Sequence, residues 1–328
     1  MRRLALVAMT LTAASAQIVL DTDSGPFGDD GVALTMLLRS PRRDDLRGIT
    51  VVSGNVWSRD GAGFMSRNAK LLGAPALPVL VGSEAPLLHT AAMRRKENPI
   101  AFAGAFDLPE PAAPTQPARG GIDFLIRSVD AAPGQVTILA IGPLTNIAIA
   151  LRLRPDIASK IGSLVMMGGN VHVPGNAGKA AEFNFWFDPE AARIVLRSEI
   201  PHKVLFALDV CNKAHFTKQL FDEIVAVKTP ITDLYREDFG NGFPGFLKNP
   251  RARGSLWDEL AAAYVIEPRL VKKSESLWLD VETAFGAAYG AVQPLDRSLA
   301  PGATPVTVVL DMDFERVLGI YRGALTAR

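Results

Sequence analysis

The sequence predicts one large α/β domain, with a mostly parallel, Rossmann-type central sheet and helices on both faces. Three observations predict this class. Short apolar or β-branched runs alternate with segments of helical apolar spacing through most of the 328 residues. Several of the expected strands are apolar throughout, which is typical of a sheet covered on both faces. Hydrophobic residues make up 48% of the chain and charged residues 21%, as in a globular protein with a large core.

The first part of the chain supplies three strands joined by two helices. β-branched and apolar runs bounded by polar turn residues indicate the strands, and apolar spacing of three and four residues indicates the helices. The elements expected here are strand 18–20, helix 32–38, strand 48–52, helix 63–72 and strand 78–81. The segment 108–119 contains four prolines, so we expect a loop or lid there.

The alternation then resumes and continues to the C-terminus. The expected elements are helix 122–129, strand 136–141, helix 145–151, strand 163–167, helix 189–196 and strand 203–208. A mainly helical stretch follows over 217–259, interrupted at 241–245, and then helix 256–265, strands 277–281 and 305–310 and helix 314–325. Crossovers along most of the chain favour one domain over two.

The N-terminus has the layout of a secretory signal peptide. Arg2 and Arg3 precede an apolar run over 4–13, and Ala14-Ser15-Ala16 fits a small-x-small cleavage site. The alternative is a frayed hydrophobic tail. We therefore expect a signal peptide at 1–16, a folded domain at 17–328, and a secreted or periplasmic protein. A single cysteine, Cys211, agrees with export to an oxidising compartment.

Composition excludes several classes of function. A net charge of +1 favours neither nucleic acid nor an anionic membrane as a partner. Four histidines and one cysteine exclude a Cys/His zinc cluster and an intrachain disulfide. The N-terminal apolar run is too short to span a bilayer as an anchor, and no other stretch is long and apolar enough to do so. The sequence leaves open whether the chain is a homo-oligomer, such as a dimer or tetramer.

Four carboxylates stand where the first strand ends and the first helix begins: Asp21, Asp23, Asp29 and Asp30. In open α/β sheets this end of a strand is where ligands bind. Acids this close together repel one another unless a cation lies among them, and calcium prefers several oxygen ligands. A helix cap with first-turn acids would explain Asp29 or Asp30, but not the other two as well. The sequence therefore predicts a metal site.

Further polar groups follow later strands and are weaker signals one by one. Amide and acid side chains among aromatic residues suit the recognition of sugar hydroxyls. Taken alone, each of these segments could be a turn, a helix cap or a first-turn acid. They are Ser53-Gly54-Asn55, Ile141 to Asn146, Met167 to Asn170, Asn176, Glu182-Phe183-Asn184 and Trp257-Asp258.

Together these segments resemble the inosine–uridine-type nucleoside hydrolase family. The resemblance covers about residues 18–322, and the motifs occur in the family's order. It implies a nucleoside hydrolase-like catalytic domain that cleaves a nucleoside into ribose and free base, with Ca²⁺ as cofactor and a role in nucleoside salvage. By position, the resemblance assigns the calcium ligands to Asp23, Asp30, Asp258 and the carbonyl of Ile141. It assigns the general base to Asp29, and the ribose pocket to Asn55, Met167, Asn176, Glu182 and Asn184.

The sequence also departs from the family pattern. Phe27 stands where a longer variant carries another Asp. Trp257 stands where many members have the histidine that protonates the leaving group, as in the purine-preferring branch, where a Trp stacks on the base. We therefore expect a purine preference, with Trp257 both catalytic and base-binding and with Phe102 or Phe106 as the opposite aromatic wall. His89 is interpreted as a surface residue rather than a pocket residue.

Two other functions fit parts of the sequence. An Asp-x-Asp phosphatase would use Asp21 as nucleophile and Asp23 as acid. It would leave the later asparagines and Trp257 without a role. A non-catalytic ribose- or nucleoside-binding protein on the same scaffold would not need Asp29. We therefore favour the hydrolase.

Overall fold

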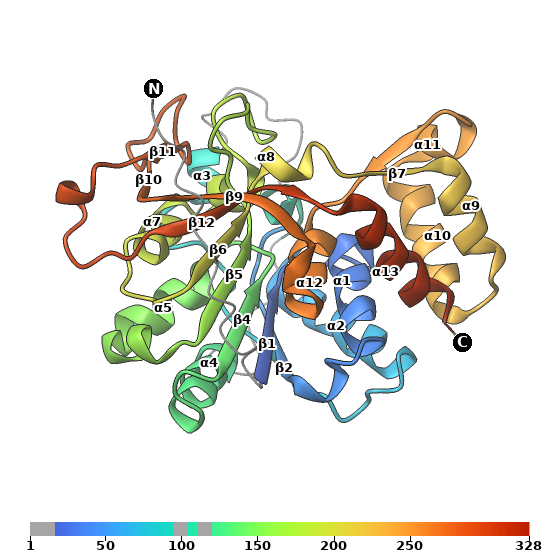
Figure 1. Ribbon diagram of the computed structural model, residues 1–328, viewed down its shortest axis with the longest axis horizontal. Helices are drawn as coiled ribbons and strands as arrows, with labels where there is room; N and C mark the ends of the chain where they lie inside the picture. Colours follow the sequence, from blue (N-terminus) through green and yellow to red (C-terminus); the bar gives the residue numbers. More distant parts are fainter. Residues whose placement is uncertain (1–16, 95–103, 110–119, 328) are drawn as a thin grey trace.

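The computed structural model describes residues 17–94, 104–109 and 120–327 (Figure 1). The expected signal peptide at 1–16 and most of the proline-rich loop lie outside these residues. Among the described helices, none combines the length and the apolar character that a bilayer crossing requires.

An eight-stranded sheet runs through the middle of the molecule, as the sequence predicts. Its spatial order is β3-β2-β1-β4-β5-β6-β12-β9, and every neighbouring pair is parallel except β12 and β9. The strands are β1 (Gln17–Thr22), β2 (Leu46–Val51), β3 (Val79–Val81), β4 (Val136–Ala140), β5 (Ser163–Met167), β6 (Lys203–Phe206), β9 (Val271–Leu277) and β12 (Val306–Met312).

Helices cover both faces of the sheet (Figure 1). One face carries α1 (Gly28–Leu38), α2 (Ser58–Leu71), α12 (Asp258–Ile266) and α13 (Phe314–Thr326), and the other carries α4 (Gly120–Ala131), α5 (Thr145–Leu153) and α7 (Pro189–Leu196). Successive strand residues point to opposite faces, so Leu139 joins the first core and Ile138 the second. Both cores are therefore built from the same fully buried strands, which explains why the sequence shows apolar runs rather than alternation.

A helical layer extends the first face beyond the sheet (Figure 1). It contains α9 (Lys218–Ala226), α10 (Pro230–Gly242) and α11 (Pro244–Lys248), with the small ladder of β7 (His215–Thr217) and β8 (Arg253–Ser255) beside them. Thr229 starts α10 with a reciprocal capping box to Thr232. The interruption expected at 241–245 falls at Phe243, where α10 ends and α11 begins. Aromatic rings from these helices and from β7 pack together around Phe239.

The structure adds elements that the sequence patterns do not predict. β9 has the sequence VKKSESL, which is too polar to indicate a strand, yet it pairs antiparallel to β12. The expected strand 203–208 stops at Phe206, and Leu208 begins the short helix α8 (Leu208–Cys211). The expected strand 277–281 is divided between β9 and β10 (Leu279–Val281), which pairs with β11 (Val292–Pro294). The four-residue helix α3 (Ala91–Arg94) and the short helix α6 (Phe183–Phe187) were likewise not expected.

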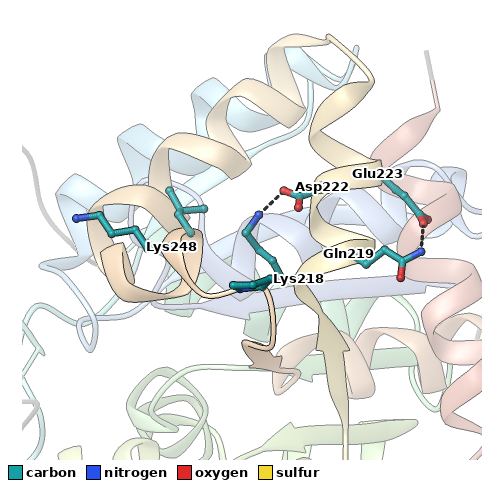
Figure 2. Close-up of a pocket in the computed structure, with 7 residues that line it drawn as sticks. Lys218, Gln219, Asp222, Glu223 and Lys248 are labelled. Carbon is teal, nitrogen blue, oxygen red and sulfur yellow. Dashed lines mark hydrogen bonds and ion pairs between the residues drawn. The ribbon is translucent and has the colours of Figure 1, made fainter.

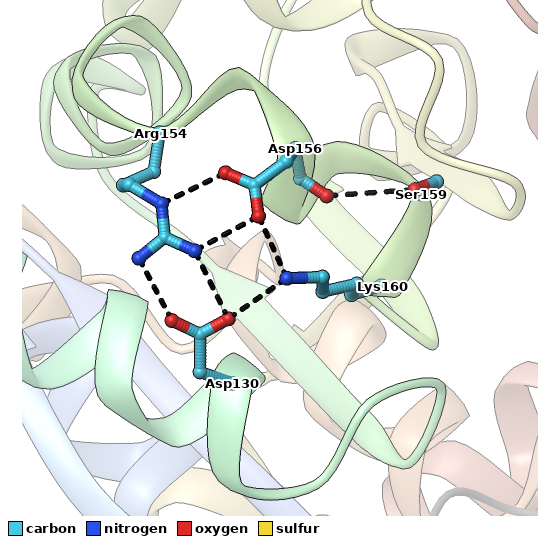
Figure 3. A network of polar contacts seen from close by, with 5 residues as sticks. All are labelled: Asp130, Arg154, Asp156, Ser159 and Lys160. Atoms are coloured by element: carbon cyan, nitrogen blue, oxygen red, sulfur yellow. Dashed lines mark hydrogen bonds and ion pairs between the residues drawn. The ribbon is translucent and has the colours of Figure 1, made fainter.

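A charged network at the opposite end from the acidic residues joins the end of α4 to the segment after α5. Arg154 binds Asp130 at 2.9 Å and Asp156 at 2.8 Å, and Lys160 binds the same two carboxylates at 3.0 and 2.7 Å (Figure 3). These ion pairs lower the pKa values of both acids. Because the groups are exposed to solvent, the network orients a surface turn and contributes little to folding.

Candidate active site

The acidic residues lie at the carboxyl end of β1. Asp21 is the fifth residue of that strand, Asp23 follows its end, and Asp29 and Asp30 lie in the first turn of α1. β1 is a central strand, between β2 and β4. The side chains are therefore placed at the edge of the sheet where α/β proteins bind ligands.

Three carboxylates from distant parts of the sequence meet at this edge. Asp29, Asp30 and Asp258 each offer an oxygen, and these oxygens all lie within 4.8 Å of one another. Asp258 is the first residue of α12, which packs against α1. Asp30 and Asp258 are buried, and Asp29 keeps part of its surface exposed. The packing of the two helices thus brings together acids that the sequence motifs only suggested.

Asp23 lies beside this group, on its β2 and β4 side. Its Oδ2 accepts a hydrogen bond from the backbone N–H of Asn55 at 2.7 Å. Gly54 and Gly142 stand so close to its carboxylate that a Cβ on either would contact it at 2.1 and 2.8 Å, respectively. Burial raises the pKa of Asp23 to about 8, and the charges of Asp29 and Glu182 add to the shift.

The electrostatics of the cluster favour a cation. Burial raises the pKa values of Asp30 and Asp258 well above the usual range, and neighbouring carboxylates raise them further. Burial also raises the pKa of Asp29 to about 6. Asp30 Oδ2 is buried without a hydrogen-bond partner in the described structure. Closely spaced oxygen ligands, one of them unsatisfied, fit a hard divalent cation.

Asp21 serves the scaffold instead. It is fully buried, and its Oδ1 accepts hydrogen bonds from Thr50 Oγ1 at 2.5 Å and from Asn146 Nδ2 at 2.7 Å. Asn146 also accepts from the backbone N–H of Ser83 at 2.7 Å. This network ties β1, β2 and the start of α5 together. A carboxylate enclosed in this way has no access to a substrate, which removes the nucleophile that an Asp-x-Asp phosphatase requires.

Glu182 and Asn184 lie beside the cluster, at the carboxyl end of β5. Glu182 accepts backbone N–H bonds from Gly169 at 2.7 Å and from Asn184 at 2.9 Å, and so caps helix α6. Asn184 Nδ2 donates to the carbonyls of Ile141 at 3.1 Å and Met167 at 3.2 Å. The predicted metal-binding carbonyl and the predicted ribose-pocket residues are therefore direct neighbours.

The remaining predicted residues differ in exposure. Asn55 is half-buried and touches Asp23 through its backbone. Asn176 is exposed, and its Oδ1 accepts from the N–H of Phe183 at 2.9 Å. Trp257 directly precedes α12 and is half-buried. Its backbone N–H donates to Glu259 Oε2 at 2.9 Å. Asn176 is the predicted residue that lies most clearly at the surface.

The interpretation of His89 as a surface residue was wrong. His89 is fully buried, and its ring meets those of Trp186 and Tyr289 edge-on at centroid distances of 4.8 and 5.0 Å. Burial lowers its pKa to about 4, and its Nδ1 contacts the carbonyl oxygen of Trp186 at 3.0 Å. Phe106 belongs to the same aromatic cluster and stacks on Phe187 at 4.4 Å, while Phe102 lies outside the described residues.

Two acids near Asp29 were missed by the sequence analysis. Glu259 follows Asp258 and is 3% exposed, and the charge of Asp29 raises its pKa in addition to burial. Asp238 comes from α10, and its charge raises the pKa of Asp29. Asp238 lies on an amphipathic helix, where a carboxylate normally faces solvent, and Glu259 reads as an ordinary first-turn acid of an apolar helix, so no local pattern distinguishes either residue.

A shallow groove with a volume of about 360 Å³ lies between α9 and α11, away from these acids (Figure 2). Lys218 and Asp222 form an ion pair at 2.5 Å along it, and Gln219 and Glu223 bond at 3.1 Å. Four of its polar side chains are thus paired with one another, and none of the predicted site residues lines the groove.

Comparisons with known proteins agree with this geometry. The family model described as inosine-uridine preferring nucleoside hydrolase matches residues 18–319. The pyrimidine-specific ribonucleoside hydrolase RihB of Escherichia coli (strain SE11) is 30% identical over 303 residues, which cover 91% of this chain and 94% of that protein. RihA of Citrobacter koseri, also named pyrimidine-specific, is 31% identical over 302 residues, which cover 89% of this chain and 92% of that protein.

Solved structures give the same fold. An inosine-guanosine nucleoside hydrolase superposes with a TM-score of 0.77 at 26% identity, covering 95% of this chain and all of that one. A purine-preferring ribonucleoside hydrolase from Gardnerella vaginalis gives a TM-score of 0.75 at 26% identity, covering 94% of this chain and 98% of that one.

Proposed function

The chain belongs to the inosine-uridine preferring nucleoside hydrolase family and is an N-glycosyl hydrolase, and we propose that it uses Asp29 as general base and Ca²⁺ as cofactor to release ribose and free base from ribonucleosides. The observation that carries this proposal is the meeting of Asp29, Asp30 and Asp258 at the carboxyl edge of the sheet. Pure binding of a nucleoside would not need a partly exposed carboxylate at this point.

The residues that would hold Ca²⁺ are Asp23, Asp30, Asp258 and the carbonyl of Ile141. All of them offer hard oxygen ligands, and the buried, unsatisfied Oδ2 of Asp30 supports their assignment. The chemistry that Ca²⁺ supplies when bound is positive charge, which offsets the repulsion among these acids and makes a neighbouring water easier to deprotonate.

In the proposed reaction, a carboxylate oxygen of Asp29 takes a proton from water while the water oxygen attacks the anomeric carbon. The bond between that carbon and the base nitrogen breaks, and its electron pair leaves with the base. Asn55, Asn176, Glu182 and Asn184 would bind the ribose hydroxyls. The capping bonds of Glu182 leave acceptor capacity for a hydroxyl, because each carboxylate oxygen has more than one lone pair.

We propose a preference for purine nucleosides, on the basis of Trp257. A purine can accept a proton on its imidazole nitrogen as it leaves, and an indole face stabilises a cationic ring by about 0.5–2 kcal/mol. The two purine-directed relatives of known structure agree with this preference, whereas the names of the two pyrimidine-specific relatives favour the opposite one. The neutral, buried His89 is a poor substitute for the missing acid.

A base-release assay over a nucleoside panel tests the proposal. We expect inosine, adenosine and guanosine to be cleaved faster than uridine and cytidine, and all activity to be lost after exhaustive chelation. Faster cleavage of uridine would reject the purine preference while leaving the reaction intact. Full activity without metal would reject the cofactor.

We also propose that residues 1–16 direct export and are removed. The expected N-terminus of the mature protein is Gln17, the first residue of β1. N-terminal sequencing of protein from the periplasm or medium would test this, and recovery of the intact chain from the cytosol alone would contradict it.

A further inference from the structure

The turn that leads into Asp29 is held by residues outside the acidic cluster. It spans residues 24–28 and leads from the end of β1 to the first residue of α1. Its last residue, Gly28, has a φ of +59°, which L side chains rarely adopt. The side chain of Phe27, at the N-cap position of α1, makes no capping hydrogen bond. The first N–H groups of the helix therefore need acceptors from elsewhere.

Asp238 supplies such an acceptor from far along the chain. The backbone N–H of Gly28 donates to Asp238 Oδ2 at 3.1 Å, across 210 residues of sequence. Burial raises the pKa of Asp238, and hydrogen bonds from the Gly28 and Phe27 backbones oppose that rise. The helix that carries Asp238, α10, packs against both α1 and α2. Its carboxylate is thus fixed relative to the start of α1.

The neighbouring contacts hold the same turn from two sides. Tyr235 lies three residues before Asp238, on the same face of α10, and its ring meets that of Phe27 edge-on at 6.3 Å. Phe27 is 1% exposed. On the other side, Arg67 and Asn68 of α2 both donate to the carbonyl of Pro26, Asn68 at 3.3 Å.

We propose that Asp238 is a positioning residue for hydrolysis, which fixes the turn at residues 27–28 and thereby the placement of Asp29. The inference rests on the proposed role of Asp29 as general base. Gly28 is joined directly to Asp29, so a shift of the turn moves the carboxylate that must reach the attacking water. Misplacement of a reacting group by about 1 Å can cost about 10²-fold in rate.

Steady-state kinetics with inosine at saturating Ca²⁺ can test this role. We expect Asp238→Ala to lower kcat by roughly 10- to 100-fold, with KM changed less than about threefold. Asp238→Asn should keep kcat within about threefold of wild type, because its amide oxygen can still accept from the Gly28 N–H. Glu237→Ala is the matched control, since Glu237 is the adjacent acid on α10 and is exposed. It should behave as wild type.

Calorimetric Ca²⁺ titration and thermal melting accompany the kinetics. All three variants should bind Ca²⁺ as wild type does and be fully folded at the assay temperature. If Asp238→Ala does not fold, Asp238→Ser provides the same test with a side chain too short to reach Gly28.

Three results would overturn the role of Asp238. The first is a normal kcat in Asp238→Ala or, where that variant does not fold, in Asp238→Ser. The second is a loss of kcat in Asp238→Asn as large as in Asp238→Ala. The third is a change in the KM of Asp238→Ala with no change in its kcat. Normal turnover of Asp29→Ala would instead refute the proposed base, so the two failures are distinguishable.

Discussion

Replacing Gly54 by alanine should disable the site without changing any polar group. A Cβ at this position would lie 2.1 Å from Asp23 Oδ2 and 2.7 Å from its Cγ, well inside the 3.0 Å that real Cβ contacts respect. The backbone at Gly54 does not have a positive φ, so alanine brings no conformational strain of its own. The carboxylate must therefore move by about 1 Å, because contacts shorter than van der Waals distance are not tolerated in packed interiors.

The structure leaves Asp23 little room for that movement. Its Oδ2 is bonded to the Asn55 N–H, and Gly142 closes in on Oδ1 from the other side. Calcium–oxygen distances vary only over about 2.3–2.6 Å, so a shift of about 1 Å breaks a ligand bond. We expect Gly54→Ala to weaken Ca²⁺ binding at least about 10-fold and to lower kcat/KM about 10²-fold.

The assays are calorimetric Ca²⁺ titration and ribose release from inosine. Gly142→Ala should give a smaller loss, because its Cβ would meet Asp23 at 2.8 Å. Gly63→Ala is the control: it lies in α2 with no atom within 4 Å of its added Cβ, and should keep full activity with stability raised by up to about 1 kcal/mol. Wild-type metal affinity and turnover in Gly54→Ala would refute the placement of Asp23 in the metal site.

Four further outcomes are expected. Removing Ca²⁺ should lower Tm, since a ligand present at 100 times its Kd stabilises the native state by about 2.7 kcal/mol; an unchanged melting curve with chelator would contradict this. Asp29→Ala should lower kcat about 10²–10⁴-fold while Ca²⁺ still binds, and loss of binding would make Asp29 a ligand rather than a base. Trp257→Ala should slow cleavage of inosine more than that of uridine, and equal losses on both would argue against stacking. Burial lowers the pKa of Lys203 to about 7. The unfolded chain therefore binds more protons than the native one between pH 7 and about 10. The free energy of unfolding should rise with pH in that range, by at most about 1.4 kcal/mol per pH unit. Urea unfolding of wild type and Lys203→Met checks this, because the variant should lack that rise.

Apolar patterning predicted the parallel part of the sheet closely. The expected strand 163–167 and helix 189–196 match β5 and α7 at both ends. β5 is buried along most of its length, which gives the apolar run that predicts a strand. α7 begins directly after its N-cap, Asp188, so its start is marked in the sequence. β9 was missed because five of its seven residues are polar and none is fully buried, and its place as an edge strand depends on pairing with β12.

The acidic cluster was predictable because most of its members share one turn. Asp23, Asp29 and Asp30 are close in sequence, and only Asp258 had to be added through the family resemblance. The environment of each acid could not be predicted, because it depends on contacts across the fold. Asp21 lies in the same turn yet is enclosed by Thr50 and Asn146.

Long-range partners explain the other failures. Asp238 reaches Gly28 only because α10 packs on α1, and no spacing in the sequence encodes that approach. His89 is enclosed by rings from three separate segments, represented by Phe106, Trp186 and Tyr289. No spacing around His89 in the sequence indicates which rings it will meet, so its burial could not be predicted.

The two borders of the central sheet affect how the protein behaves in a concentrated solution. Unpaired strand borders are templates for the addition of a strand from another molecule. Here one border is β3, only three residues long, and the other is β9, which presents the exposed side chains of Lys272 and Lys273. Short and lysine-bearing borders resist such addition, which protects a sheet this apolar from growing into fibrous aggregates. An assembly of several copies would therefore have to pack helices and loops against one another instead of continuing the sheet.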